Sequence, residues 1–306
     1  MTPFVLAGVD GSTGSAAAAR WAAGEAERRG VPLRLVHAWP WLTDGRNAMA
    51  EPDHLPAAAE RVLADAAAEL RAAHPGLDVR TDVVLDAPVD GLVAAAEDAG
   101  LLVVGSRGLG GFAGLMLGSV GMAVAARSSV PVVVVRERQE GAGGSSVVVG
   151  VDVQEPDEGV LGFAFAEAAR RRARVRAVHG WDLPPVFAYA GWVPQAAEIS
   201  QLEAMEEKML SLALAGQREL HPGVEVVEEV RLGAAGALVE ASAGAALVVV
   251  GRKRRRVELG PRLGRIAHAV LHPPRARGGV APPGCPAGVS RRGGGAPRPP
   301  APRSRP

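Results

Sequence analysis

Short apolar runs recur along the first half of the chain, each bounded by glycine, proline or polar residues. Most of them carry few charged side chains, which is typical of strands in a parallel sheet that is covered on both faces. The runs predict five strands, at Phe4–Val9, Leu33–Ala38, Val79–Leu85, Leu101–Gly105 and Val132–Val135.

Longer alanine-rich stretches separate these runs and predict helices. Ser12 and Ser15 can cap the first helix, which is expected to end near Arg29 because Gly30 follows it. Three further helices are expected at about 56–74, 89–99 and 119–127. This alternation predicts a doubly wound α/β unit, a five-stranded parallel sheet with helices on both faces.

The second half of the chain repeats the first. Four motifs return in the same order at offsets of 142 to 147 residues, which indicates two copies of one domain. The pairs are LAGVDGS (6–12) with VVGVDVQ (148–154), RLVHAW (34–39) with RAVHGW (176–181), HPGLDV (74–79) with HPGVEV (221–226), and LLVVGSRG (101–108) with LVVVGRKR (247–254). We therefore expect a first domain at 1–138, a linker at 139–145 and a second domain at 146–272.

The second copy is expected to lack its last strand. Its predicted elements are strands at Val147–Val151, Arg174–His179, Val224–Arg231 and Leu247–Gly251 and a helix at Arg265–Leu271. Residues 273–306 contain ten prolines, seven glycines and seven arginines among 34 residues, and no apolar run like Val132–Val135. A segment of that composition predicts a disordered tail.

Composition and charge narrow the class of protein. The 306 residues, 48% of them apolar, suit two ordinary domains. The sequence contains no run of 18 apolar residues, so no membrane span is predicted. The N-terminus does not resemble a signal peptide, and the single Cys285 excludes a disulfide framework or a multi-cysteine metal site, so we expect a cytoplasmic protein. The net charge is +1, but removing the seven tail arginines leaves −6, which argues against nucleic acid as the main partner.

A glycine-rich loop follows the fourth predicted strand, with the spacing Gly105-x2-Gly108-x9-Gly118-Ser119. Ligands of open parallel sheets bind at the carboxyl ends of strands, and a helix beginning at Ser119 would point backbone N–H groups at a phosphate. Asp10 ends the first strand at the same edge, where it can accept from ribose hydroxyls, hold a metal, or merely cap the next helix. A turn without a ligand is the alternative interpretation of the glycines.

This spacing, with GVDGS after the first strand and SSVPVVVV at the last, resembles the ATP-binding signature of the universal stress protein family. The resemblance covers about 3–137 and 146–272, and it implies an adenine nucleotide α-hydrolase-like fold in a tandem member. It also implies a regulatory protein that binds ATP, with Mg²⁺ as a further candidate, and pairing of the two domains, with a homodimer left open. The implied nucleotide contacts are Val9 and Asp10 near adenine and ribose, Ala38 near adenine, Val104, Gly105 and Gly108 near ribose and phosphates, and Gly118, Ser119 and Val120 at the distal phosphates.

Two other functions stay open at this point. One is a slow ATP hydrolase or nucleotidyl-transfer enzyme, although no general base is readable and catalytic residues are not predicted. The other is a nucleotide-free dimerisation module. The run GLGGFA (108–113) matches a dinucleotide fingerprint only as a lone motif after the wrong strand, so it carries little weight.

The second copy departs from the signature. Gly251 and Gly264 keep the spacing, but Arg254 and Arg265 replace the second glycine and the serine. The copy has either lost nucleotide binding, which we favour, or binds an anion differently. Its basic run at 252–256 is typical of a solvated loop more than of a nucleic-acid site. The paired histidines and tryptophans at strand ends are interpreted as packed or hydrogen-bonded, not metal-binding: His37, Trp39, His179 and Trp181.

Overall fold

The computed structural model of the chain describes residues 3–39, 55–108, 118–136, 144–183, 195–252, 263–271 and 278–281. The predicted linker falls mostly outside these ranges. The first unit alternates strand and helix as expected. Its strands are β1 (Val5–Gly8), β2 (Leu33–Ala38), β3 (Val79–Val84), β4 (Leu101–Gly105) and β5 (Val132–Val135), and its helices are α1 (Thr13–Arg29), α2 (Leu55–Ala73), α3 (Pro88–Ala95) and α4 (Ser119–Arg127).

The second unit repeats this order and the parallel pairing of its strands. Its strands are β6 (Ser146–Gly150), β7 (Arg174–Trp181), β8 (Val226–Leu232), β9 (Leu247–Gly251) and β10 (Gly278–Ala281), and its helices are α5 (Glu158–Arg171), α7 (Ala196–Leu220), α8 (Ala234–Ala241) and α9 (Arg265–Leu271). The predicted fold of two doubly wound α/β units is confirmed.

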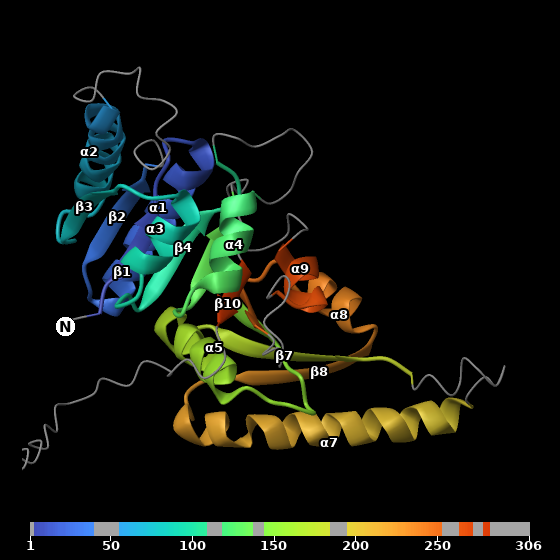
Figure 1. Cartoon of the computed structure of the whole chain (residues 1–306). Coiled ribbons are helices and arrows are strands. Elements are labelled where there is room, and N and C mark those ends of the chain that lie inside the picture. The colour runs from blue at the N-terminus through green and yellow to red at the C-terminus, as the bar shows by residue number, and fades with distance from the viewer. Residues whose placement is uncertain are drawn as a thin grey trace, which may run out of the picture.

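One sheet runs through both units in the order β3-β2-β1-β4-β5-β10-β9-β6-β7-β8 (Figure 1). The strands are parallel within each unit, and β5 pairs antiparallel with β10 where the units meet. The expectation that the second copy ends without a last strand needs correction. The four residues of β10 lie inside the predicted tail, and they form a strand because β9 and β5 pair with their backbone on either side.

Helices cover both faces of this sheet, as the apolar strands require. Helices α1, α2, α5 and α7 pack on one face, and α3, α4, α8 and α9 pack on the other. Alternate residues of β5 point into the two layers, Val133 and Val135 into the first and Val132 and Val134 into the second. Every side chain of this central strand is buried.

Local signals set the ends of α1. Ser12 is the N-cap, and its hydroxyl accepts from the Ser15 backbone N–H at 3.1 Å. Gly30 adopts the left-handed conformation, with φ of 63°, and its N–H closes the last turn. Both features agree with the sequence prediction. The equivalent residue after α5 is Arg172, which adopts the same conformation with φ of 49°.

A network of buried ion pairs joins α1 to α5. Glu25 and Glu167 are both 0% exposed, and each lies between Arg29 and Arg171. Arg29 donates to Glu25 at 2.7 Å and to Glu167 at 2.6 Å, and Arg171 donates to Glu25 at 2.7 Å and also to Glu167. Since the two helices contribute the same residue types, the network is nearly two-fold symmetric.

Two arginines cap helices of the opposite unit. Arg252, directly after β9, donates to the carbonyls of Ala126 and Ser128 at 3.0 and 2.8 Å, where α4 ends. Arg136, directly after β5, donates to the carbonyl of Leu271, where α9 ends. Cations suit helix C-termini because the last carbonyls lack partners and carry partial negative charge. The first residue of the basic run at 252–256 therefore contacts the first unit, contrary to the expected solvated loop.

Candidate functional site

The carboxyl ends of β1 and β4 lie side by side, because β1 pairs with β4 in the sheet. The Asp10 carboxylate at this edge accepts from the Ser12 backbone N–H at 3.0 Å and from the Ser12 hydroxyl at 2.6 Å. The Asp10 backbone N–H in turn donates to the Ser15 hydroxyl at 3.2 Å. Asp10 thus holds Ser12, the N-cap of α1, in place and is not itself the cap considered above, and its second oxygen, Oδ2, faces Gly108.

The two glycines after β4 meet different neighbours. A methyl group on Gly105 would lie 2.7 Å from the carbonyl atoms of Gly14, so Gly105 allows the first turn of α1 to pack on the end of β4. A methyl group on Gly108 would overlap the Oδ2 atom of Asp10. Gly105 is therefore explained by packing, and Gly108 by the close approach of a carboxylate to the loop.

Gly118 closes the described part of this loop. Its N–H donates to the Ser106 carbonyl at 2.7 Å, and it is the N-cap of α4 with φ of −72° and no side-chain cap. Ser119 is the first residue of α4 and is exposed, and Val120 is half-buried. Among the described residues no side chain caps the first backbone N–H groups of α4, which is the arrangement that suits an anion. Residues 109–117 of the loop lie outside the described ranges.

The other predicted contacts are placed less uniformly. Val9 is buried, and its N–H donates to the Val36 carbonyl at 2.9 Å. Ala38 is half-buried at the carboxyl end of β2, on the far side of β1 from the loop. Val104 is 4% exposed and packs in the layer of α3 and α4, so only its backbone belongs to this edge.

Two residues at this edge were not among the predicted contacts. A methyl group on Gly14 would lie 2.5 Å from the Arg107 carbonyl, so the α1 helix and the loop after β4 are in close contact there. Ser106 is buried, and its N–H donates to the Val135 carbonyl at 2.7 Å while its own carbonyl accepts from Gly118. The sequence could have indicated the contact at Gly14, because a glycine in the first turn of a helix allows close packing. It could not have indicated Ser106, because that residue is positioned by its hydrogen bond to β5.

The second unit builds this edge differently. The cap of α5 is Asp157, five residues after Asp152, so the loop after β6 is longer than the one after β1. A methyl group on Gly251 would meet the Val160 side chain at 3.1 Å, so a buried valine stands where α1 presents only the Gly14 backbone. Arg265 begins α9, which has seven residues, and Arg254 lies outside the described residues.

The matched histidines also differ. The His179 ring lies 3.0 Å from the Val151 carbonyl through Nδ1 and 3.1 Å from the Glu206 carboxylate through Nε2. His37 is buried beside Trp39, with ring centroids 5.4 Å apart, and its Nδ1 has no hydrogen-bond partner among the described residues. His179 is thus hydrogen-bonded and His37 is packed, as the sequence suggested. Glu206 of α7 reaches the carboxyl edge of the second unit.

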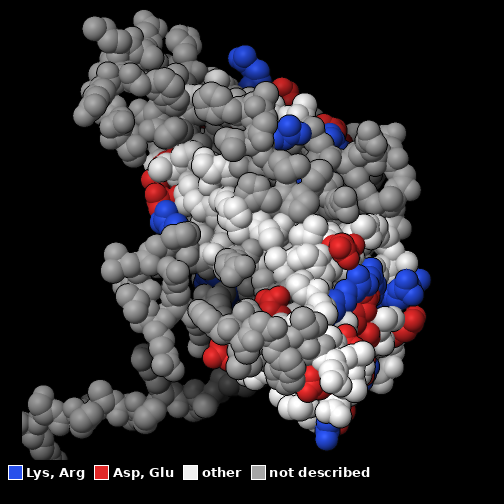
Figure 2. Space-filling model, turned by 90° about the vertical axis from the view of Figure 1, so that its right-hand side faces the viewer, with Lys and Arg blue, Asp and Glu red and all other residues white. Residues whose placement is uncertain are grey.

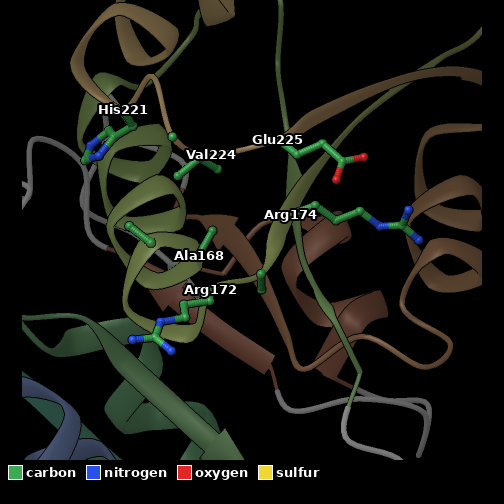
Figure 3. A pocket seen from close by; sticks show the side chains of 9 residues that line it. Ala168, Arg172, Arg174, His221, Val224 and Glu225 are labelled. Atoms are coloured by element: carbon green, nitrogen blue, oxygen red, sulfur yellow. The ribbon is translucent and has the colours of Figure 1, made fainter.

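A cavity among the described residues lies elsewhere. It has a volume of about 450 Å³ and is lined by residues of the turn between α5 and β7 and of the segment before β8, at the amino ends of these strands. Figure 3 shows that Arg172 and His221 lie on one side of it and that Arg174 and Glu225 point to the other. The charged groups do not converge, and no predicted site residue lines this cavity.

The surface and the helices bear on two other classes of partner. On the face shown in Figure 2, the described Lys and Arg side chains lie beside Asp and Glu side chains and form no continuous basic area. No helix within the described ranges combines the length and the apolarity that crossing a membrane requires.

Comparison with known proteins gives consistent matches in both halves. The model of the universal stress protein family matches residues 1–136 and 145–273. Universal stress proteins of Mycobacterium bovis and Mycobacterium tuberculosis are each 34% identical to this chain over 293 residues, which cover 89% of the chain and 94% of each relative. A crystal structure of a universal stress protein from Archaeoglobus fulgidus superposes with a TM-score of 0.65 and 19% identity, covering 91% of this chain and 97% of that one.

Proposed function

Because this chain belongs to the universal stress protein family, we propose that its first unit binds ATP and that nucleotide occupancy, not turnover, is what the protein uses. The observation that carries the proposal is the meeting of α4, Gly118 and Asp10 at one edge of the sheet. The uncapped N–H groups there can donate to phosphate oxygens, and the nearby Asp10 carboxylate can accept from ribose hydroxyls.

The remaining contacts follow from the order of the strands. The backbone at Val9 and Ala38 would meet the adenine ring beside β1 and β2, and the backbone at Val104, Gly105 and Gly108 would run along ribose and phosphates. Gly118, Ser119 and Val120 would hold the distal phosphates. These roles are those implied by the family resemblance, and the geometry is compatible with each of them as a backbone contact.

Magnesium fits this site only together with the nucleotide. Mg²⁺ usually takes one or two carboxylates, with phosphate oxygens and water completing its shell. Asp10 supplies one carboxylate, and the described residues contain no cluster of three or more metal-ligating side chains. When bound, the ion would neutralise phosphate charge while Asp10 and the α4 N–H groups hold the complex in place.

We propose a single site in each chain. In the second unit Val160 fills the space beside Gly251, whereas Gly105 of the first unit has only backbone atoms of α1 beside it. Among the described residues, Asp10 is the carboxylate at the first site, and we assign it to ribose hydroxyls or Mg²⁺ and not to proton transfer, because its Oδ1 atom accepts from Ser12 and is held in place. A regulatory binding role therefore fits better than fast hydrolysis or nucleotidyl transfer.

Calorimetry with Mg²⁺-ATP tests the proposal. Ser119→Glu puts a carboxylate in the first turn of α4, where it favours the helix but repels phosphate, and Ser119→Gln is the neutral control of similar size. We expect one ATP per wild-type chain, at least tenfold weaker binding for the Glu variant and nearly unchanged binding for the Gln variant. No binding at millimolar ATP would contradict the proposal in favour of a nucleotide-free module, two ATP per chain would contradict the single site, and rapid release of ADP would favour an enzyme.

A further inference from the structure

Helix α7 carries most of the large apolar side chains that the described structure leaves in solvent. Seven large hydrophobic side chains are at least 36% exposed within the described ranges, and four of them lie on this one helix. They are Met205 at 66%, Met209 at 36%, Leu212 at 62% and Leu220 at 71%. Single exposed apolar residues are ordinary, but a group on one element marks an interaction surface.

These side chains form one stripe along α7. Met205, Met209 and Leu212 follow each other by four and three residues, and Gly216 and Leu220 continue in steps of four. This spacing keeps them on one side of a helix and is that of a coiled-coil seam. The core contacts of α7 are made by Leu210 and Leu214, which are fully buried, so the stripe is separate from the core face.

The fold itself does not require the stripe, as α2 shows. This helix has the same place in the first unit, and the His-Pro-Gly turns after the two helices lie 147 residues apart. Leu63 of α2 and Leu210 of α7 are related by this offset, and both are buried. At the stripe positions α2 has Ala58, Val62, Asp65, Glu69 and Ala73 in place of the two methionines, Leu212, Gly216 and Leu220.

We propose that the stripe on α7 binds the same stripe of a second copy of the chain, with the two helices antiparallel. Such a pairing is self-complementary, because a two-fold axis near Leu212, at the middle of the stripe, brings Met205 of each copy opposite Leu220 of the other. Charge favours this direction. Residues 196–207 carry four glutamates and no basic residue, whereas residues 208–220 carry Lys208 and Arg218 against one glutamate.

The strands at which the two units meet are not open to a second copy. The last strands of the two units, β5 and β10, already pair with each other inside one chain, so they are covered. Helix α7 runs along one side of the molecule, over β7 and β8 (Figure 1). With 25 residues it is about 37 Å long, and its seam spans little more than two heptads. We therefore expect weak pairing, in the micromolar range.

Sedimentation velocity of the full chain from 1 to 200 µM tests the proposal. The variant Met205→Ala with Leu212→Asp gives α7 the residues that α2 carries, and Leu85→Asp is the matched control at an exposed apolar residue away from α7. We expect a concentration-dependent dimer for wild type and the control, and at least 100-fold weaker association for the double variant. Melting temperatures within a few degrees of each other establish that all three are folded.

A cross-link tests the geometry. In a Cys285→Ser background, Leu212→Cys places a thiol near the two-fold axis, whereas Glu207→Cys places one on another side of α7. Diamide oxidation should convert the first variant to a disulfide-linked dimer and leave the second monomeric. A wild-type chain that stays monomeric at 200 µM, a double variant that dimerises normally, or equal cross-linking of the two cysteine variants would overturn the proposal. The first of these outcomes would point to a different protein as the occupant.

Discussion

Replacing Glu25 by glutamine removes one of the two buried negative charges between α1 and α5. The Glu25 carboxylate is 0% exposed, and the side chains of Arg29 and Arg171 that donate to it are only 12% and 11% exposed. Solvent therefore cannot replace the lost partner. Removing one member of a buried ion pair costs about 3–5 kcal/mol, because the remaining charge is left uncompensated. Since Glu167 still contacts both arginines, we expect a loss near the lower end, about 3 kcal/mol.

Urea unfolding at neutral pH measures this loss. Glu69→Gln is the matched control, because Glu69 pairs with Arg20 at 3.0 Å while both side chains are 54% exposed. Exposed pairs contribute about 0–1 kcal/mol, so the control should change little. A loss for Glu25→Gln no larger than that of the control would refute the reasoning, since it would mean that the buried network does not hold the units together.

The same variant has a pH signature. Burial raises the pKa of Glu25, but the charges of Arg171, Arg29 and Arg28 outweigh this effect and bring its pKa below the ordinary 4.5. A carboxyl group whose pKa is depressed by folding stabilises the protein above its unfolded pKa, and this contribution is lost as the pH falls through the folded pKa. The difference in unfolding free energy between wild type and variant should be constant above pH 4.5 and shrink below it. A difference that persists unchanged in strong acid would contradict this assignment.

Three further substitutions test the packing at the sheet's carboxyl edge and the cap at the end of α4. Gly105→Ala should lower the unfolding free energy by about 1–3 kcal/mol, because its methyl group would meet backbone atoms of Gly14 that cannot move aside. Gly251→Ala should cost less, because its methyl group would meet only a valine side chain. Equal losses of stability in thermal melts would contradict the packing argument. Arg252→Met should lower the unfolding free energy by about 1–2 kcal/mol, because it removes the charged donor at the end of α4. Amide hydrogen exchange should rise first in the last turn of α4. Unchanged exchange there would rule out the capping role.

The sequence predicted the fold well wherever apolar runs were long enough to be read. Strand β10 was missed because Gly278–Ala281 contains one large apolar residue, Val280, and no alternation. It is a strand because β5 and β9 supply hydrogen-bonding partners on both sides. Pairing of this kind depends on chain segments far apart in sequence, and strand propensity does not report it.

The candidate site was predictable in position but not in the role of each residue. The spacing of glycines pointed to the loop after β4. Gly105, however, allows the close contact with Gly14, and a glycine that allows packing looks the same in a sequence as one that allows a ligand to approach. Arg252 belongs to a basic run that suggested solvent, and its contact lies more than 120 residues away. Nucleotide binding by Asp10 and by the start of α4 stays a prediction.

The ring of Glu25, Arg29, Glu167 and Arg171 has a consequence for how the two halves diverge. Both copies carry the same Glu-x-x-Arg-Arg pattern. Because the two copies are joined in one polypeptide, each half meets its binding partner at an effective concentration in the millimolar range. The ring lies at the C-terminal ends of α1 and α5, whereas the glycine pattern lies beyond the opposite edge of the sheet. The residues that pair the two halves are therefore different from the residues of the loop, and either set can change without the other. The second half has arginines at positions 254 and 265 of its loop pattern and the same ring residues as the first half, so the two halves pair through like residues while their loops differ.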